Sequence, residues 1–160
     1  MAKTARPRKD FDTSSLKVGD ILWYKNIETA SSKNPNHPHI IVAIEDDWFY
    51  TVGGTSQQET IERKIKHNGH DHSMFPAFEK PEHGLRNTTF FDCTQNFEIN
   101  GRVLKKKYQK GELVKKAGSL TVGEYEQLRL ALRKNASCDI SDILIHPDDE
   151  VDGYEEAAEE

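Results

Sequence analysis

Gly19-Asp20-Ile21-Leu22-Trp23 is the stretch on which the fold prediction depends. Val18-Gly19-Asp20 is typical of a turn, and the apolar and aromatic residues that follow it, through Tyr24, favour a strand. On its N-terminal side, residues 1–14 are basic and rich in serine and threonine, which predicts a flexible basic arm. The folded domain is therefore expected to begin near residue 15.

The next two strands are expected to form a hairpin. Residues 26–38 are rich in Ser, Asn and Pro, which predicts a long exposed loop. Residues 39–45 form a nearly continuous apolar run, which favours a strand that is central or buried on both faces. After a tight turn at Asp46-Asp47, residues 48–52 are predicted to return as its partner, and Gly53-Gly54 to end that strand.

Later segments predict further short strands. Residues 59–65 alternate well enough for an edge strand, and a second loop is expected over 67–83. Residues 88–93 are β-branched and aromatic, which favours another strand. Residues 97–104 are predicted to form a hairpin that turns at Asn100-Gly101, because Asn-Gly suits a type I′ turn.

The last predicted element is a helix. Thr121 and Glu124 have the spacing of a capping box, and Tyr125, Leu128 and Leu132 share one face of a helix that is expected to end at Asn135. No helix is predicted between strands, so the sequence indicates a mainly β domain, a small barrel with a C-terminal helix, over residues 15–146.

Composition restricts the class of protein. A chain of 160 residues with 35% hydrophobic residues can form one domain with a core. The longest apolar run, residues 40–44, is far shorter than the roughly 20 residues that cross a bilayer, so no membrane association is expected. Cys93 and Cys138 have no CxxC spacing, which predicts no disulfide framework and favours a cytoplasmic location.

Charge is unevenly distributed along the chain. Residues 147–160 carry many acids and no base, and are predicted to be a disordered tail that either solubilises the protein or competes for a phosphate-binding face. Residues 102–116 hold a single acid, Glu112, among basic residues that can attract phosphate; these are Arg102, Lys105, Lys106, Lys107, Lys110, Lys115 and Lys116.

Three histidines and an aspartate lie close together in the loop at residues 67–72. Zinc sites use such ligands, but the spacing matches no recognisable zinc pattern and no second cluster accompanies it. We therefore interpret the segment as a solvated loop, and predict no metal site and no cofactor.

Five segments, in order along the chain, resemble the PemK/MazF/Kid family of toxin ribonucleases (the CcdB/PemK superfamily). They are Gly19-Asp20-Ile21-Leu22-Trp23, His37-Pro38-His39-Ile40-Ile41-Val42, Val52-Gly53-Gly54-Thr55-Ser56-Gln57, Thr89 to Gln95, and Ala117-Gly118-Ser119-Leu120-Thr121. The resemblance covers about residues 16–135 and implies an SH3-like barrel with a terminal helix. It also implies a type II toxin that cleaves single-stranded RNA by attack of the ribose 2′-hydroxyl, a homodimer, and an antitoxin protein as partner.

The resemblance also implies where the site residues lie, and two positions differ from the family pattern. His37 stands where the family has a catalytic Arg, and Thr94-Gln95 replaces an Asp-Gln pair. Histidine can transfer protons near neutral pH, so His37 and Thr55 are the predicted catalytic residues. His39 is expected on the opposite face of the same strand. The predicted substrate-binding residues are Ser56, Gln57, Arg86 (as a replacement guanidinium), Lys105, Lys106 and Lys107.

Two other functions remain open at the level of the sequence. The domain could be a catalytically inactive barrel that binds RNA or a protein on the same face. Alternatively, it could bind only a protein partner, in which case the basic residues 102–116 would have no affinity for RNA.

Overall fold

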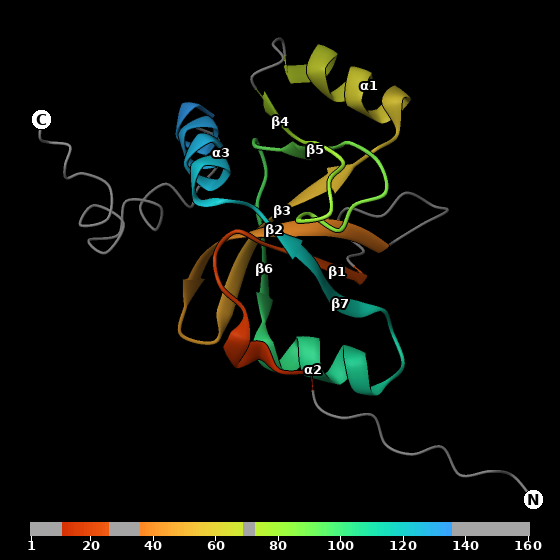
Figure 1. Cartoon of the computed structure of the whole chain (residues 1–160), viewed down its shortest axis with the longest axis vertical. Coiled ribbons are helices and arrows are strands. Elements are labelled where there is room, and N and C mark those ends of the chain that lie inside the picture. The colour runs from red at the N-terminus through yellow and green to blue at the C-terminus, as the bar shows by residue number, and fades with distance from the viewer. Residues whose placement is uncertain (1–10, 26–35, 69–72, 136–160) are drawn as a thin grey trace, which may run out of the picture.

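Figure 1 shows the computed structural model of the chain, which describes residues 11–25, 36–68 and 73–135. In this part of the chain, seven strands form a mostly antiparallel sheet: β1 (Asp20–Lys25), β2 (Asn36–Glu45), β3 (Trp48–Thr55), β4 (Met74–Ala77), β5 (Thr89–Asp92), β6 (Phe97–Asn100) and β7 (Val114–Ser119). The helical elements are a short 3-10 turn η1 (Thr13–Ser15), α1 (Gln58–Asn68), α2 (Gly101–Gln109) and α3 (Val122–Lys134). The predicted mainly β class with a C-terminal helix is confirmed.

The sheet is an open path rather than a closed ring. Its order is β4-β5-β3-β2-β1-β7, and β6 pairs with the first half of β3 while β5 pairs with its end. Among the described strands, none joins β7 back to β6 or β4, so the predicted barrel is not closed. Helix α2 contacts both β6 and β7, and Figure 1 shows it at one end of the sheet, away from α1 and α3.

Both faces of the central strands are buried, which explains the continuous apolar run of β2. Ile40 and Val42 belong to a core cluster with Leu128 and Leu132 of α3, on one face of the sheet. Ile41 points to the other face and joins a second cluster with Leu104 of α2. Successive side chains of a strand face opposite sides, so the part of a strand that lies between two cores is buried on both faces; this holds for residues 39–43 of the predicted strand, whereas Ile44 and Glu45 are exposed.

Helix α3 follows its sequence signal closely. The Thr121 hydroxyl accepts from the Glu124 amide at 3.1 Å, and the Glu124 carboxylate accepts from the Thr121 amide at 2.8 Å, which completes the capping box. Leu128 and Leu132 are buried, and Asn135 is the C-cap.

Two segments predicted as strands, residues 59–65 and residues 102–104 of the predicted hairpin, are helical. Residues 59–65 lie in α1, where Ile61 is buried and Ile65 half-buried one turn later, so their spacing of four is that of a helix face. Asn100-Gly101 does not form a hairpin turn. Asn100 instead caps α2, its side chain accepting from the Arg102 amide at 2.8 Å. Asparagine suits both roles, because its carbonyl oxygen can replace a missing helical acceptor.

Three further boundaries differ from the sequence prediction. Strand β2 begins at Asn36, so His37 and Pro38 lie in a strand rather than in the predicted loop. Gly53-Gly54 continues β3 to Thr55 instead of ending it. The predicted loop over 67–83 contains β4, whose Pro76 is tolerated because β4 is an edge strand of the described sheet.

Other predictions fall outside the described residues. The basic arm lies largely in 1–10, and the acidic tail and Cys138 lie in 136–160. Within the described residues, no helix has the length and apolar character needed to span a membrane.

Candidate functional site

A pocket of about 250 Å³ lies where β2, β3 and β5 meet α1. Three residues predicted from the sequence line it, namely His37, Thr55 and Gln57. The pocket is smaller than the roughly 300–1,000 Å³ of most ligand sites. It therefore suits a small group, such as one phosphodiester with its neighbouring hydroxyl, better than a whole nucleotide.

Strand register brings His37 and Thr55 together. His39 pairs with Gly53 at the end of the β2–β3 ladder, and His37 and Thr55 each lie two residues beyond this pair, on the same face of their strands as His39 and Gly53. Residues opposite one another in an antiparallel pair share a face, so both side chains project into the same space. Thr55 also pairs with Phe90 of β5, which extends the row across the pocket floor.

His39 is buried next to the pocket and supports the position of His37. Its ring stacks on Tyr24 with ring centroids 4.0 Å apart, and its Nδ1 lies 2.9 Å from the His37 carbonyl oxygen, to which it donates. The ring also meets Phe97, which lines the pocket with His37. The expectation that His39 faces away from His37 is therefore wrong, because residues two apart on a strand point to the same side.

Burial decides the charge of His39. The side chain is fully buried, and this burial lowers its pKa to about 3 against the opposing influence of the His37 carbonyl. The ring is therefore neutral at neutral pH. His39 is a structural support for the pocket, and the proton-transfer candidate is His37, whose half-buried side chain lines the pocket itself.

Thr55 and Gln57 are arranged at the end of β3. The Thr55 hydroxyl oxygen accepts from the Gln57 amide at 3.1 Å, and a hydroxyl that accepts one bond still has a proton to donate. Gly54 beside them must be glycine for packing reasons. A Cβ there would lie 2.6 Å from the Phe91 ring, so this glycine accommodates the core and not only a ligand.

An acidic residue that the sequence analysis missed also lines the pocket. Asp92 is 7% exposed, and its Oδ2 lies 2.9 Å from the Lys64 Nζ. Its other oxygen accepts from the amide and the hydroxyl of Thr94, at 2.9 and 2.6 Å. The sequence comparison placed the missing family Asp at Thr94. The structure has a carboxylate two residues earlier, and Gln95 lines the same pocket.

The pocket also contains a guanidinium that the sequence analysis missed. Arg63 of α1 lines it and is exposed, and among the described residues it forms no ion pair with a carboxylate. It was missed because residues 59–65 were interpreted as a strand. The helical spacing of Ile61 and Ile65 is the signal that could have revealed it, since it turns Arg63 and Lys64 together toward β5.

The remaining predicted substrate-binding residues lie elsewhere. Ser56 and Arg86 line a second pocket, of about 330 Å³, with Trp23 and Lys115. Lys105, Lys106 and Lys107 are on α2, at the end of the sheet remote from α1 (Figure 1). The structure thus groups His37, Thr55 and Gln57, places Ser56 and Arg86 together in a neighbouring pocket, and separates the three lysines from both.

No metal cluster is found in the described part of the chain, where no three His, Cys, Asp or Glu side chains converge. His70, Asp71 and His72 of the predicted solvated loop lie outside the described residues.

Comparisons with known proteins find a similar fold but no matching family. No protein-family model matches the chain, and no curated protein does. Among solved structures, the fold is similar to a chain of the MazE–MazF complex (Form-III) from Deinococcus radiodurans, over 78% of this chain and 98% of that one. The TM-score is 0.45 and the sequence identity 10%. A likeness of this size assigns no activity, so a functional inference must rest on the residues of the pocket.

Proposed function

We propose that this chain is an endoribonuclease that cleaves single-stranded RNA without a metal ion, using the pocket between β2, β3, β5 and α1. One observation carries the proposal: a histidine, a hydroxyl donor and a guanidinium line a single small pocket. These are His37, Thr55 and Arg63. Cleavage by an internal 2′-hydroxyl needs a proton acceptor for that hydroxyl and donors for the charge that develops on the phosphoryl oxygens.

Each group then has a defined role in the reaction. His37 accepts the 2′-hydroxyl proton as the 2′-oxygen bonds to phosphorus. The bond from phosphorus to the 5′-oxygen breaks, that oxygen takes a proton from water, and the resulting hydroxide takes back the proton that His37 accepted. The Thr55 hydroxyl donates a hydrogen bond to one non-bridging phosphoryl oxygen, and the Arg63 guanidinium donates hydrogen bonds to the other. The products are a 2′,3′-cyclic phosphate and a 5′-hydroxyl.

The Lys64–Asp92 pair serves the site by fixing α1 against the sheet. Its two atoms are 2.9 Å apart, and the Asp92 side chain is largely buried. The Asp92 carboxylate also accepts two hydrogen bonds from Thr94, and these hold it in place. Arg63, the residue before Lys64 in α1, is thereby held at the pocket edge, so Lys64 and Asp92 are positioning residues.

The proposal extends to biological context through the sequence resemblance. We place the chain among toxins of toxin–antitoxin pairs, acting in the cytoplasm as a homodimer that an antitoxin protein binds. The uncompensated cation Arg63 at the pocket is the kind of group that an acidic partner segment would neutralise.

The direct test is cleavage of a mixed-sequence single-stranded RNA in chelator-containing buffer. Wild type is expected to yield fragments ending in a 2′,3′-cyclic phosphate, and His37→Ala to lose about 100-fold or more in rate. His67→Ala is the matched control, because His67 is an exposed histidine of α1 that does not line the pocket. Intact RNA with wild type, or equal cutting by His37→Ala, would overturn the proposal.

The alternative is a catalytically inactive domain that binds RNA or a protein on the same face. The observation that favours it is the histidine at the position of the family arginine. Retained RNA binding with a steep salt dependence and no cleavage would select this reading. Absence of RNA binding at any salt concentration would leave a protein partner as the ligand.

A further inference from the structure

The second pocket lies on the other face of the same sheet end. Thr55, at the end of β3, lines the first pocket, and Ser56, the next residue, lines the second. In β5, Phe90 lines the first pocket and Thr89 the second. Neighbouring residues of a strand face opposite sides. Only the thickness of the sheet therefore separates the two pockets, and both lie where β3 ends and β5 begins.

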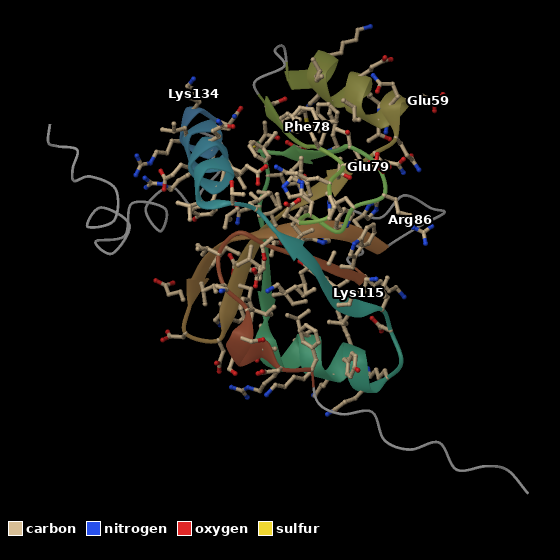
Figure 2. The ribbon with its side chains drawn as sticks, viewed as in Figure 1. Glu59, Phe78, Glu79, Arg86, Lys115 and Lys134 are labelled. Carbon is tan, nitrogen blue, oxygen red and sulfur yellow. The ribbon has the colours of Figure 1, made fainter. Side chains whose placement is uncertain are left out.

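The walls of the second pocket combine an aromatic ring with two cations. Trp23 of β1 pairs directly with Lys115 of β7, and Arg86 comes from the loop before β5. Figure 2 shows Arg86 and Lys115 on the same side of the molecule. Trp23 is half-buried against the core, whereas both cations are exposed. The indole thus packs against the core, while the charged groups are accessible to a ligand.

No acidic residue lines this pocket, and within the described part of the chain neither Arg86 nor Lys115 forms an ion pair. Lys116, the neighbour of Lys115, is in contrast 3.5 Å from Asp20. Two uncompensated cations beside one ring make a local positive field that favours an anion.

The loop that carries Arg86 is fixed to the rest of the fold. The Ser119 amide of β7 donates to the Glu82 carbonyl at 2.9 Å, and the His83 Nε2 lies 3.0 Å from a Glu124 carboxylate oxygen at the start of α3. Gly84 has a φ of +66°, and a Cβ there would collide with the Ala117 backbone. The loop is therefore clamped against β7, which presets the position of Arg86 before any ligand arrives.

We propose that this second pocket binds one nucleotide of single-stranded RNA, the base stacking on Trp23 and the phosphate lying between Arg86 and Lys115. Asn87 and Ser56, which also line the pocket, can hydrogen-bond the edge of the base. Base stacking on aromatic side chains with cations on the backbone is how single strands are held. The volume of about 330 Å³ is within the range of ligand sites.

This inference rests on the proposed function for the identity of the ligand as RNA. An RNA strand whose scissile phosphate lies near His37 crosses the end of the sheet. It can continue around Ser56, so that the adjacent nucleotide contacts Trp23. The second pocket then selects the nucleotide beside the cleaved bond, and the first pocket performs the chemistry.

Tryptophan fluorescence tests the proposal directly. The chain has two tryptophans, and Trp48 is 43% exposed at the start of β3, so Trp48→Phe leaves Trp23 as the only reporter. Titration of this variant with each of the four nucleoside 5′-monophosphates is expected to quench Trp23 with a Kd of about 1 mM or tighter for at least one base. Inorganic phosphate should quench at least 10-fold more weakly, because it cannot stack.

Matched variants assign the binding to the pocket. In the same background, Arg86→Gln and Lys115→Gln should each raise the Kd several-fold, whereas Arg133→Gln, an exposed arginine of α3, should leave it unchanged. No saturable quenching by any nucleotide, or quenching that survives the double Arg86→Gln, Lys115→Gln variant, would overturn the inference. Tighter binding of phosphotyrosine than of every nucleotide would also overturn it, in favour of a phosphopeptide site.

The two proposals can fail separately. Quenching by nucleotides without RNA cleavage would leave the second pocket and remove the catalytic function. Cleavage that requires His37 but shows no nucleotide binding at Trp23 would do the reverse.

Discussion

The α1 end and the α2 end of the molecule both carry basic residues, but α2 carries more of them, without acidic residues among them, and the surroundings of the two helices differ. Arg63 and Lys64 of α1 line a pocket beside His37 and Thr55. Lys105–Lys107 of α2 lie at the opposite end, where the helix covers an apolar cluster that includes Leu104 (Figure 1). The denser basic run is therefore not the one that lines the candidate site. Position relative to proton-transfer groups, and not charge density, distinguishes a site from a solvated helix.

The largest expected effect is on the pH dependence of folding stability, and it comes from His39, the buried imidazole next to the pocket. The pKa of His39 is about 3 in the folded protein and near 6.5 in an unfolded chain. Below pH 6.5 the unfolded chain binds a proton that the folded one does not, so stability falls as the pH drops toward 3. At roughly 1.4 kcal/mol per pH unit, wild type should lose about 3 kcal/mol relative to His39→Phe between about pH 7 and pH 4.

Urea unfolding of both proteins across that pH range measures this difference. His39→Phe can retain the stacking on Tyr24 but cannot be charged, and should be less stable than wild type near pH 7 by about 1 kcal/mol for the lost hydrogen bond. Parallel pH dependences of the two proteins would show that His39 is not buried in the neutral form.

The next largest effect is on kcat, and it distinguishes the α1 end from the α2 end. Arg63→Gln should lower kcat for RNA cleavage by about 100-fold, because removal of one preorganised donor to a developing oxyanion costs that much. Lys106→Gln on α2, also an exposed cation, is the matched control and should leave kcat within a few-fold of wild type. Equal kcat values for the two variants would remove the distinction between the ends.

Local signals in the sequence predicted some elements and not others. The apolar run at 40–44 predicted a strand buried on both faces, and Thr121 with Glu124 predicted the start of α3, because each signal lies within a few residues. Ile61 and Ile65 lie on one face of a helix, but the alternation between them also suits a strand. Strand β7 was not predicted at all, since four of the six residues of Val114–Ser119 are lysine, alanine or glycine, and the segment is a strand through its pairing with β1.

The candidate site was only partly predictable for the same reason. His37 and Thr55 were found through resemblance to a family, and the register of β2 and β3 places them together. The contact between Lys64 and Asp92 joins residues 28 positions apart in the chain, and no local pattern indicates it. Arg63 could not be assigned to the site while its segment was interpreted as a strand.

A smaller effect tests whether the α2 end is independent of the pocket. Asn100→Ala removes the side-chain oxygen that accepts from the Arg102 amide, and should cost about 1 kcal/mol of folding free energy. Asn100→Asp keeps a capping oxygen and should cost much less. Chemical denaturation measures both, and cleavage at saturating RNA should be unaltered in either variant. A fall in kcat with Asn100→Ala alone would mean that α2 supports the pocket at a distance.

The smallest effect concerns the three α2 lysines predicted to bind RNA. If they contact only phosphates outside the pocket, the triple variant Lys105→Gln, Lys106→Gln, Lys107→Gln should raise KM a few-fold and leave kcat unchanged. The slope of log Kobs against log salt should become shallower by about 0.7 for each lost contact with single-stranded RNA. Unchanged KM and slope would show that RNA does not reach α2. A fall in kcat with unchanged KM would instead place these lysines at the reacting phosphate, which in this fold requires a second copy of the chain to bring its α2 to the pocket.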